Sequence, residues 1–143
     1  MNMFISSLIF IALFAVSIAH FAWALGFTWP IRNEKLLAQT VVGFKGIETM
    51  PPRLLSLLVA LAALGAAVFA LALADHDSGG VLLNLAGIVL ALVFLARGIA
   101  GYTVWWTNLT PEPNFRLNDR RVYSPLCLAL GVGYVALLIL RLV

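Results

Sequence analysis

The chain contains few charged residues and a single cysteine, and each shortage excludes a class of protein. Only 10% of its 143 residues are charged, whereas 63% are hydrophobic. A soluble domain is typically ~25% charged and ~45–50% apolar. The same imbalance excludes intrinsic disorder, which needs low hydrophobicity and high charge. Because Cys127 stands alone, a framework of disulfides is excluded as well. A small integral membrane protein is the class that remains.

Basic residues are also too few for a nucleic-acid-binding surface. The net charge is +3, and most of the nine Lys and Arg residues fall in the gaps between apolar runs. A nucleic-acid-binding domain would instead gather them on one face or along one helix. We therefore expect the lipid bilayer, and no nucleic acid, as a partner of this chain.

Four long apolar segments follow one another along the chain. A helix that crosses ~30 Å of hydrocarbon needs about 20 mostly apolar residues, and its backbone groups must be satisfied within the segment. The segments predict helices at about 3–25, 54–74, 81–106 and 125–142. The expected fold is an all-α membrane protein in which an antiparallel four-transmembrane-helix bundle forms a single transmembrane domain over residues 1–143.

Prolines and turn-forming residues mark the ends of these segments. The pair Pro51-Pro52 precedes the second helix. Ser124-Pro125 predicts the start of the fourth helix, because serine caps free backbone N–H groups and proline suits the first helical position. Between the first two segments, residues 34–42 could form either a short interfacial helix or a plain loop.

The distribution of Lys and Arg predicts the orientation of the helices. Seven basic residues occupy the two longer loops, which lie on one side of such a bundle: Arg32, Lys35, Lys45, Arg53, Arg116, Arg120 and Arg121. The opposite side has only Arg141, near the C-terminus. Lys and Arg accumulate on the cytoplasmic side of membrane proteins. We therefore expect loops 26–53 and 107–124 to be cytoplasmic and both termini to lie outside the cell (inner) membrane.

Arg97 is the deepest charged residue within the apolar segments. An Arg near the centre of a membrane helix costs ~2.5–3.5 kcal/mol on insertion scales, so it is expected to face the bundle interior with a partner. The candidate partners are Glu48, Glu112 and Asp119, of which Asp119 is preferred. A structural ion pair, snorkelling to the interface and a ligand-binding role remain open for Arg97.

Small residues recur at helical spacing and predict close packing between helices. Lipid tails are as apolar as leucine, so membrane helices associate through close packing and polar contacts. One stripe runs along the second helix: Ala62, Ala66, Ala70 and Ala74. It favours packing within the chain, and a seam between copies in a homo-oligomer is the alternative. Gly98 and Gly101, beside Arg97, would leave room for a neighbouring chain or a ligand.

His20 lies inside the first apolar segment. A neutral imidazole can hydrogen-bond two partners, transfer a proton or bind a ligand, so structural and functional roles both remain open. A metal site is not expected, because no second ligand stands at suitable spacing on the same face. Asp75-His76-Asp77 is interpreted as a solvated turn. Cys127 would need a nearby base to act as a nucleophile, and His20 is the candidate.

Several short segments of the chain resemble a known family. They are His20 to Gly26, Arg97 to Tyr102, Leu117 to Asp119 and Tyr123 to Leu128. In this order and spacing they resemble the bacterial domain-of-unknown-function family 3995, and the resemblance covers nearly the whole chain. It implies a small four-helix membrane protein, with no assigned activity to carry over. Phe27 stands where members of that family often have a second glycine.

The polar and aromatic residues of these segments converge on the cytoplasmic half of the expected bundle. A concave site with a few polar groups in apolar walls is typical of ligand binding. We expect a pocket there in which Arg97 is the cation and Asp119 its counter-ion. Further hydrogen-bonding groups and aromatic walls complete the candidate ligand-binding residues, which are His20, Trp23, Arg97, Tyr102, Trp105, Asp119 and Tyr123.

Three functions are compatible with these features. The first is a binding or accessory membrane protein, such as a small-lipid binder or a subunit of a larger complex. The second is a membrane enzyme that acts on a lipid-soluble substrate and uses His20 or an acidic residue for proton transfer. The third is an oligomeric small transporter, which the lack of charge in the second helix disfavours. The sequence leaves both the enzymatic activity and the cofactor open.

Overall fold

The computed structural model describes residues 1–75 and 79–142. All regular structure in these residues is helical, and four stretches are long and apolar enough to cross a membrane. They are α1 (Asn2–Ala24), α3 (Arg53–Ala74), α4 (Gly80–Ala100) and the continuous stretch Pro113–Leu142, which comprises α6 (Pro113–Asn118), the π-helical turn η1 (Asp119–Tyr123) and α7 (Ser124–Leu142). The shorter helices α2 (Glu34–Val41) and α5 (Val104–Leu109) lie between them. The predicted all-α membrane protein with four spanning helices is confirmed.

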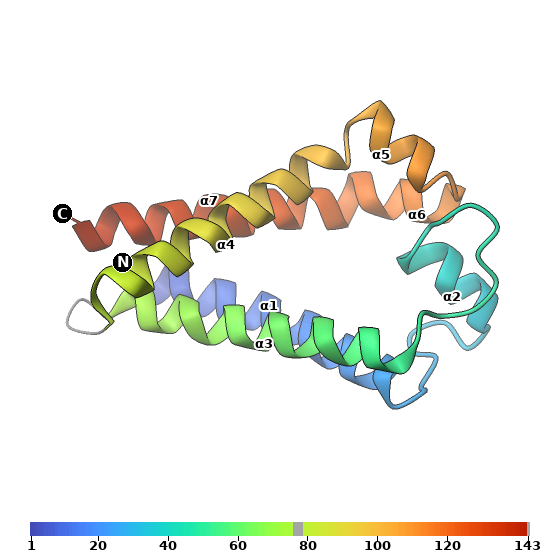
Figure 1. The fold of residues 1–143 in the computed structure, drawn as a ribbon, viewed down its shortest axis with the longest axis horizontal. Helices are drawn as coiled ribbons and strands as arrows, with labels where there is room; N and C mark the ends of the chain where they lie inside the picture. Colours follow the sequence, from blue (N-terminus) through green and yellow to red (C-terminus); the bar gives the residue numbers. More distant parts are fainter. Residues whose placement is uncertain (76–78, 143) are drawn as a thin grey trace.

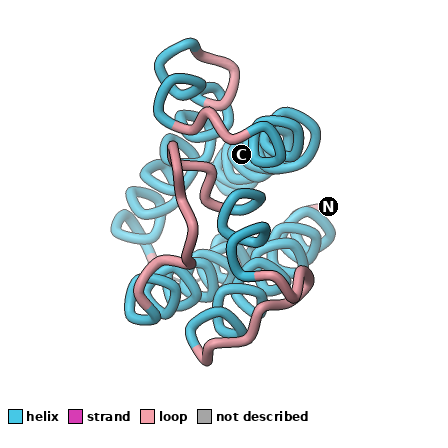
Figure 2. The backbone as a smooth tube through the Cα atoms, turned by 90° about the vertical axis from the view of Figure 1, so that its right-hand side faces the viewer, coloured by secondary structure: helices cyan, strands magenta, loops and turns pink. Residues whose placement is uncertain are grey.

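The long helices alternate in direction and form two pairs, α1 with α3 and α4 with α7 (Figure 1). The pairs lie close together at the end of the molecule that carries both termini. They diverge toward the opposite end, where α2 lies between them (Figures 1 and 2). We call this opposite end, formed by residues 25–52 and 101–123 with the adjoining ends of α3, α4 and α7, the loop end. The arrangement is therefore more open at the loop end than a uniform bundle.

The apolar core joins the two pairs in the half of the molecule nearest the termini. There Ala66, Ala70 and Ala74 of the predicted stripe are buried, whereas Ala62 is exposed. The Tyr134 hydroxyl donates a hydrogen bond of 2.6 Å to the Ala66 carbonyl oxygen, so this buried polar group is satisfied. Most of the alanine stripe thus serves packing within the chain, as small residues do in membrane helices.

The α1–α3 pair is also tied together by a buried serine. Ser17 Oγ on α1 donates to the Ala60 carbonyl oxygen on α3 at 2.8 Å, and both residues are buried. Such an approach of a side chain to a backbone carbonyl requires a small residue on the facing helix. The polar contact fixes how α1 and α3 are rotated against each other.

The third spanning helix is shorter than the predicted 81–106. It ends at Ala100, because the chain turns and the Thr103 amide donates to the Ala100 carbonyl oxygen. The Thr103 hydroxyl then accepts a hydrogen bond from the Trp106 amide and caps α5. The prediction was wrong here because Trp105 and Trp106 continue the apolar run, and hydropathy does not report a turn made by backbone hydrogen bonds.

The fourth spanning helix does not begin at Ser124-Pro125 as predicted. The helical stretch starts at Pro113, and Pro125 lies inside it. Proline lacks an N–H group and clashes with the carbonyl four residues earlier in a regular α-helix. The wider turn η1 precedes it, with the Ser124 amide donating to the Asp119 carbonyl oxygen five residues earlier. The π-helical turn thus allows the helix to continue through Pro125 without this clash.

Of the two alternatives for residues 34–42, the structure has the short helix, α2. Its first turn is capped by Asn33, whose side chain accepts a backbone hydrogen bond. Leu37 and Ala38 are fully buried. The Tyr123 hydroxyl of η1 donates to the Thr40 carbonyl oxygen at 3.2 Å, which attaches α2 to the α4–α7 pair.

Candidate binding site at the loop end

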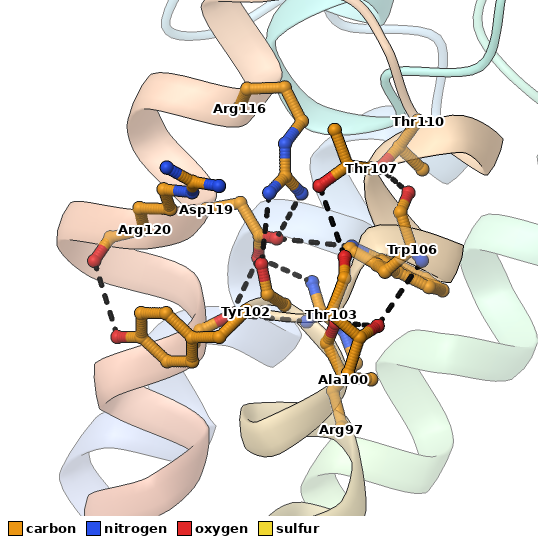
Figure 3. Close-up of polar contacts among 12 residues, drawn as sticks. Arg97, Ala100, Tyr102, Thr103, Trp106, Thr107, Thr110, Arg116, Asp119 and Arg120 are labelled. Carbon is orange, nitrogen blue, oxygen red and sulfur yellow. Dashed lines mark hydrogen bonds and ion pairs between the residues drawn. The ribbon is translucent and has the colours of Figure 1, made fainter.

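Asp119 lies fully buried in η1, and its carboxylate accepts four hydrogen bonds (Figure 3). Oδ1 accepts from the Arg97 guanidinium at 2.8 Å and from the Ser124 hydroxyl at 3.0 Å. Oδ2 accepts from the Trp106 indole N–H at 3.0 Å and from the Arg116 guanidinium at 3.2 Å. The expected ion pair between Arg97 and Asp119 is therefore present. We call these five residues the carboxylate cluster.

The two other acidic residues considered as partners of Arg97 lie elsewhere. Glu48 accepts a hydrogen bond from the Lys35 ammonium group at 2.8 Å. Glu112 accepts one from the Gly46 amide at 3.3 Å. Both belong to the loop surface, so of the three candidates only Asp119 reaches the guanidinium.

Glycines on α4 and just after it let α7 approach the cluster. A Cβ at position 101 would lie 1.7 Å from Ser124 Oγ and 3.0 Å from Asp119 Oδ2. A Cβ at position 98 would lie 2.6 Å from Leu128 Cγ. The expectation that Gly98 and Gly101 leave room for a ligand or a second chain was wrong, because side chains of the same chain fill that room.

The cluster carries two guanidinium groups against one carboxylate. The Arg97 guanidinium carbon lies 4.6 Å from the Trp106 ring centroid, in cation–π contact, and its side chain is 28% exposed. Arg116 donates a further hydrogen bond to the Gly101 carbonyl oxygen at 3.0 Å. A carboxylate offers about four acceptor positions, and those of Asp119 are all used. The geometry therefore ties α4, α5 and η1 together, with no acceptor of Asp119 left for a ligand.

Three members of the cluster were not among the predicted site residues: Trp106, Arg116 and Ser124. The spacing of Arg116 and Asp119, three residues apart on one helix, was an available signal. Trp105, which was expected to form a wall of the pocket, is 65% exposed. Its neighbour Trp106 contacts Asp119 and Arg97 instead. The turn at residues 101–103, which the sequence did not reveal, decides which of the two indoles faces the carboxylate.

Tyr102 and Tyr123 lie near the cluster without bonding to its carboxylate. The Tyr102 hydroxyl donates to the Arg120 carbonyl oxygen at 3.4 Å on the surface (Figure 3). The Tyr123 hydroxyl is engaged with the Thr40 carbonyl oxygen. Both tyrosines therefore connect segments of the loop end through hydrogen bonds: Tyr102 bonds to η1, and Tyr123 bonds to α2.

His20 and Trp23 lie on α1, in the other helix pair. His20 Nδ1 is 2.9 Å from the Val16 carbonyl oxygen, and because a carbonyl can only accept, Nδ1 carries the proton. No hydrogen bond reaches Nε2 from the described part of the chain. The two rings meet edge to face at 4.6 Å, and the Trp23 indole donates to the Trp29 carbonyl oxygen at 2.7 Å. Within residues 1–75 and 79–142, no hydrogen bond joins His20 to Arg97, so the candidate residues divide between two places.

Two adjoining hollows open at the loop end of the α1–α3 pair, and they share Trp23, Met50 and Pro51 as a common wall. The larger has a volume of about 290 Å³ and lies beside the helix ends, where Glu34 and Arg53 line it. We call it the polar hollow. The smaller has a volume of about 100 Å³, and six further residues line it: His20, Val41, Val42, Leu55, Ser56 and Val59. We call it the apolar hollow.

Glu34 and Arg53 were not predicted as site residues, because in the sequence they are ordinary loop charges. The Arg53 guanidinium lies against Gly26, where a Cβ would be 2.7 Å from Nη2, and Gly26 has a φ of +90°. Glycine is needed there both for this backbone conformation and for the approach of the guanidinium. Gly26, the last residue of the segment His20 to Gly26, was the available sequence signal that a close backbone approach occurs here.

The remaining residues that the sequence analysis considered for metal binding or nucleophilic chemistry lie elsewhere in the chain. No group of three or more His, Cys, Asp or Glu side chains there could hold a metal ion. In the predicted turn Asp75-His76-Asp77, the last two residues lie outside the described residues. Cys127 is partly buried in α7, and among the described residues no hydrogen bond joins it to His20.

Fold and site together define a multi-pass membrane protein with a satisfied charge cluster and a pair of hollows at one end. A family model described as "Protein of unknown function (DUF3995)" matches residues 13–134, so the chain belongs to this family. The matched range includes both the carboxylate cluster and the residues that line the hollows. No curated protein and no solved structure matches the chain.

Proposed function

We propose that this protein is a membrane-embedded binding protein that holds the polar head and the first carbons of an amphipathic molecule. The observation that carries the proposal is that the two hollows adjoin each other, with Trp23, Met50 and Pro51 lining both. The polar hollow lies at the helix ends and the apolar hollow lies further into the span. This order of polarity matches that of a lipid-soluble molecule anchored at the interface, and such sites are concave with few polar groups.

In this proposal the carboxylate cluster is a support of the site. Its hydrogen bonds fix η1, and Tyr123 at the end of η1 holds the Thr40 carbonyl oxygen of α2. The next residue, Val41, lines the apolar hollow. The cluster thus positions one wall of the hollow through α2, without contact with the bound molecule.

The side of the membrane follows from the basic residues. An excess of Lys and Arg at the loop end supports a cytoplasmic location for that end. The bound molecule would then enter from the cytoplasmic leaflet of the cell membrane, and both termini would face outward. Cysteine labelling of the two loops from each side of the membrane tests this orientation, and labelling from outside would overturn it.

A pair of matched variants tests the proposed function. Val59→Phe fills the apolar hollow, whereas Val68→Phe adds the same ring to an exposed position of the same helix. Native mass spectrometry after gentle extraction should detect a retained amphiphile in the wild type and in Val68→Phe, and at least tenfold less in Val59→Phe. Equal retention by both variants, or none by the wild type, would overturn the proposal.

An enzyme that acts on a lipid-soluble substrate is the second candidate function, and one observation favours it. The His20 ring lines the apolar hollow, and its Nε2 is free to accept a proton. Incubation with the lipid extract of the source membrane should then yield a new product. His20→Asn, which keeps a donor near Nδ1, should abolish that product while binding persists. Product formation by His20→Asn at the wild-type rate would exclude the role.

A transporter is disfavoured by the core between the helix pairs. The half nearest the termini is filled by packed apolar side chains such as Leu13, Leu73 and Leu137. A polar molecule crossing one subunit would have to pass through them. The proposed site therefore opens to the loop end alone.

A further inference from the structure

Two opposite charges line the polar hollow without neutralising each other. Glu34 and Arg53 both face this space. Among residues 1–75 and 79–142 they form no ion pair with each other, and neither has another charged partner. Elsewhere at the loop end, charges within reach do pair, as Lys35 and Glu48 do. The space between Glu34 and Arg53 is available to a molecule that carries both signs of charge.

Each of the two charges is held by a different element. Arg53 is the first residue of α3, and its guanidinium rests against Gly26, two residues after the end of α1. Glu34 is the first residue of α2, and one of its carboxylate oxygens accepts from the Met50 amide at 3.1 Å. Its second oxygen has no hydrogen-bond partner within the described part of the chain. The hollow thus offers one fork of donors and one free acceptor.

An aromatic ring adds a third recognition element to the same hollow. Trp23 lines the hollow, and its indole N–H is already engaged with the Trp29 carbonyl oxygen. The ring can therefore contribute its faces and edges, but no further donor. An indole face attracts a cation that lies within ~6 Å of its centroid. This favours a ligand whose positive group lies beside its negative group.

Resting on the proposed function, we infer that the polar hollow recognises the head of a phosphate ester that carries a primary ammonium group. The phosphate binds Arg53, because the planar guanidinium matches phosphate geometry with two parallel donors. The ammonium donates to the free oxygen of Glu34 and lies near Trp23. A quaternary ammonium has no N–H to donate to Glu34, and a purely anionic head group is repelled by the Glu34 carboxylate. Both should therefore bind more weakly.

The sizes of the hollows indicate how much of the molecule is enclosed. Pockets for whole ligands have volumes of ~300–1,000 Å³, so about 290 Å³ accommodates a head group but not a complete lipid. The apolar hollow adds about 100 Å³ for the first carbons. Leu55 and Val59 at its edge are 51% and 40% exposed, so the rest of a chain continues into the bilayer along α3.

Two sources could supply this chemistry, an aminophospholipid of the bilayer or a soluble ester of the same head. Four probes separate them in detergent solution, with tryptophan fluorescence as the readout: short-chain phosphatidylethanolamine, phosphatidylglycerol, phosphatidylcholine and O-phosphoethanolamine. Phosphatidylethanolamine should bind at least tenfold more tightly than each of the other three. Arg53→Gln and Glu34→Gln should each weaken its binding about tenfold.

Matched controls and a fold readout accompany these variants. Lys45→Gln and Glu48→Gln change the same types of charge outside the hollows and should leave binding unchanged. The thermal midpoint of each variant reports whether it folds, and Glu34→Gln retains the acceptor for the Met50 amide. If Glu34→Gln folds and binds phosphatidylethanolamine like the wild type, the inferred ammonium contact is overturned.

The outcomes also separate this inference from the proposed function. If phosphatidylglycerol or phosphatidylcholine binds as tightly as phosphatidylethanolamine and Val59→Phe abolishes that binding, the inference fails and the proposed function stands. If O-phosphoethanolamine binds as tightly as the lipid, the pairing of charges is supported but the proposed amphipathic ligand is overturned. If none of the four probes binds, the inference fails.

Discussion

The loop end contains two groups of polar side chains that differ in how far they satisfy one another. In the carboxylate cluster, each oxygen of Asp119 accepts two hydrogen bonds. In the polar hollow, Glu34 and Arg53 line one space and remain apart. Buried polar groups that satisfy each other hold helices in place, whereas those that remain available can bind a ligand. The comparison teaches that a deep charge in a membrane helix can be neutralised within the chain, whereas charges at the helix ends can line one space and remain unpaired among the described residues.

The largest effect is expected from Asp119→Asn. An amide replaces the charge that two guanidiniums share, and removing one partner of a buried ion pair costs about 3–5 kcal/mol. The free energy of unfolding in detergent, measured by denaturant titration, should fall by that amount. Ligand binding should decrease only in proportion to the fraction of protein that is unfolded. A decrease in the free energy of unfolding of less than ~1 kcal/mol would show that the carboxylate cluster does not stabilise the loop end.

A smaller loss is expected from Gly101→Ala. The added Cβ meets Ser124 Oγ, which must leave the carboxylate, and such overpacking costs about 1–3 kcal/mol. Gly65→Ala is the matched control, because a Cβ at that helical position meets nothing within 4 Å. The thermal midpoint should fall for Gly101→Ala and stay level or rise for Gly65→Ala. Equal shifts would contradict the close approach of α7.

A substitution in the polar hollow should weaken ligand binding with little effect on stability, whereas a substitution in the carboxylate cluster should mainly reduce stability. Arg53 is exposed and has no ion pair among the described residues. Arg53→Gln should therefore change the free energy of unfolding by no more than ~0.5 kcal/mol, while it weakens ligand binding. Parallel measurements of stability and binding check this separation. A loss of stability as large as that of Asp119→Asn would remove the distinction between the two regions.

The smallest effect is expected from the surface pair Lys35–Glu48. The hydrogen bond and the charge of Lys35 lower the pKa of Glu48, and Glu48 in turn raises the pKa of Lys35. The stabilisation by Glu48 is therefore present above its ordinary carboxyl pKa and is lost as the pH falls through the lowered value. The stabilisation by Lys35 is lost only as the pH rises through its raised pKa.

Thermal midpoints of the wild type and Glu48→Gln, compared from neutral to acidic pH, check this prediction. The two proteins should differ slightly at neutral pH and converge in acid. Exposed pairs contribute little because water and salt screen them. A difference that grows in acid would contradict the direction of the pKa shift of Glu48.

Some features of the site followed from particular residues of the sequence and others did not. A deep guanidinium needs a counter-charge, so Arg97 could be matched to Asp119 from the sequence. Trp106 could not be preferred to Trp105, because the turn at residues 101–103 sets which ring faces inward. Nor could Glu34 and Arg53 be assigned to one hollow, since α2 and α3 meet there only after the loop between them has folded.

The sequence by itself determined that this protein is all-helical and has four spans, because length and hydropathy are local properties and a helix in lipid must satisfy its own backbone. It also placed the ends of α1 and α3 within a residue or two of their observed bounds. The tertiary structure alone decided that the polar residues divide into a satisfied cluster and a pair of hollows. The physical reason is that side chains distant in sequence become partners only through the pairing of α1 with α3 and of α4 with α7.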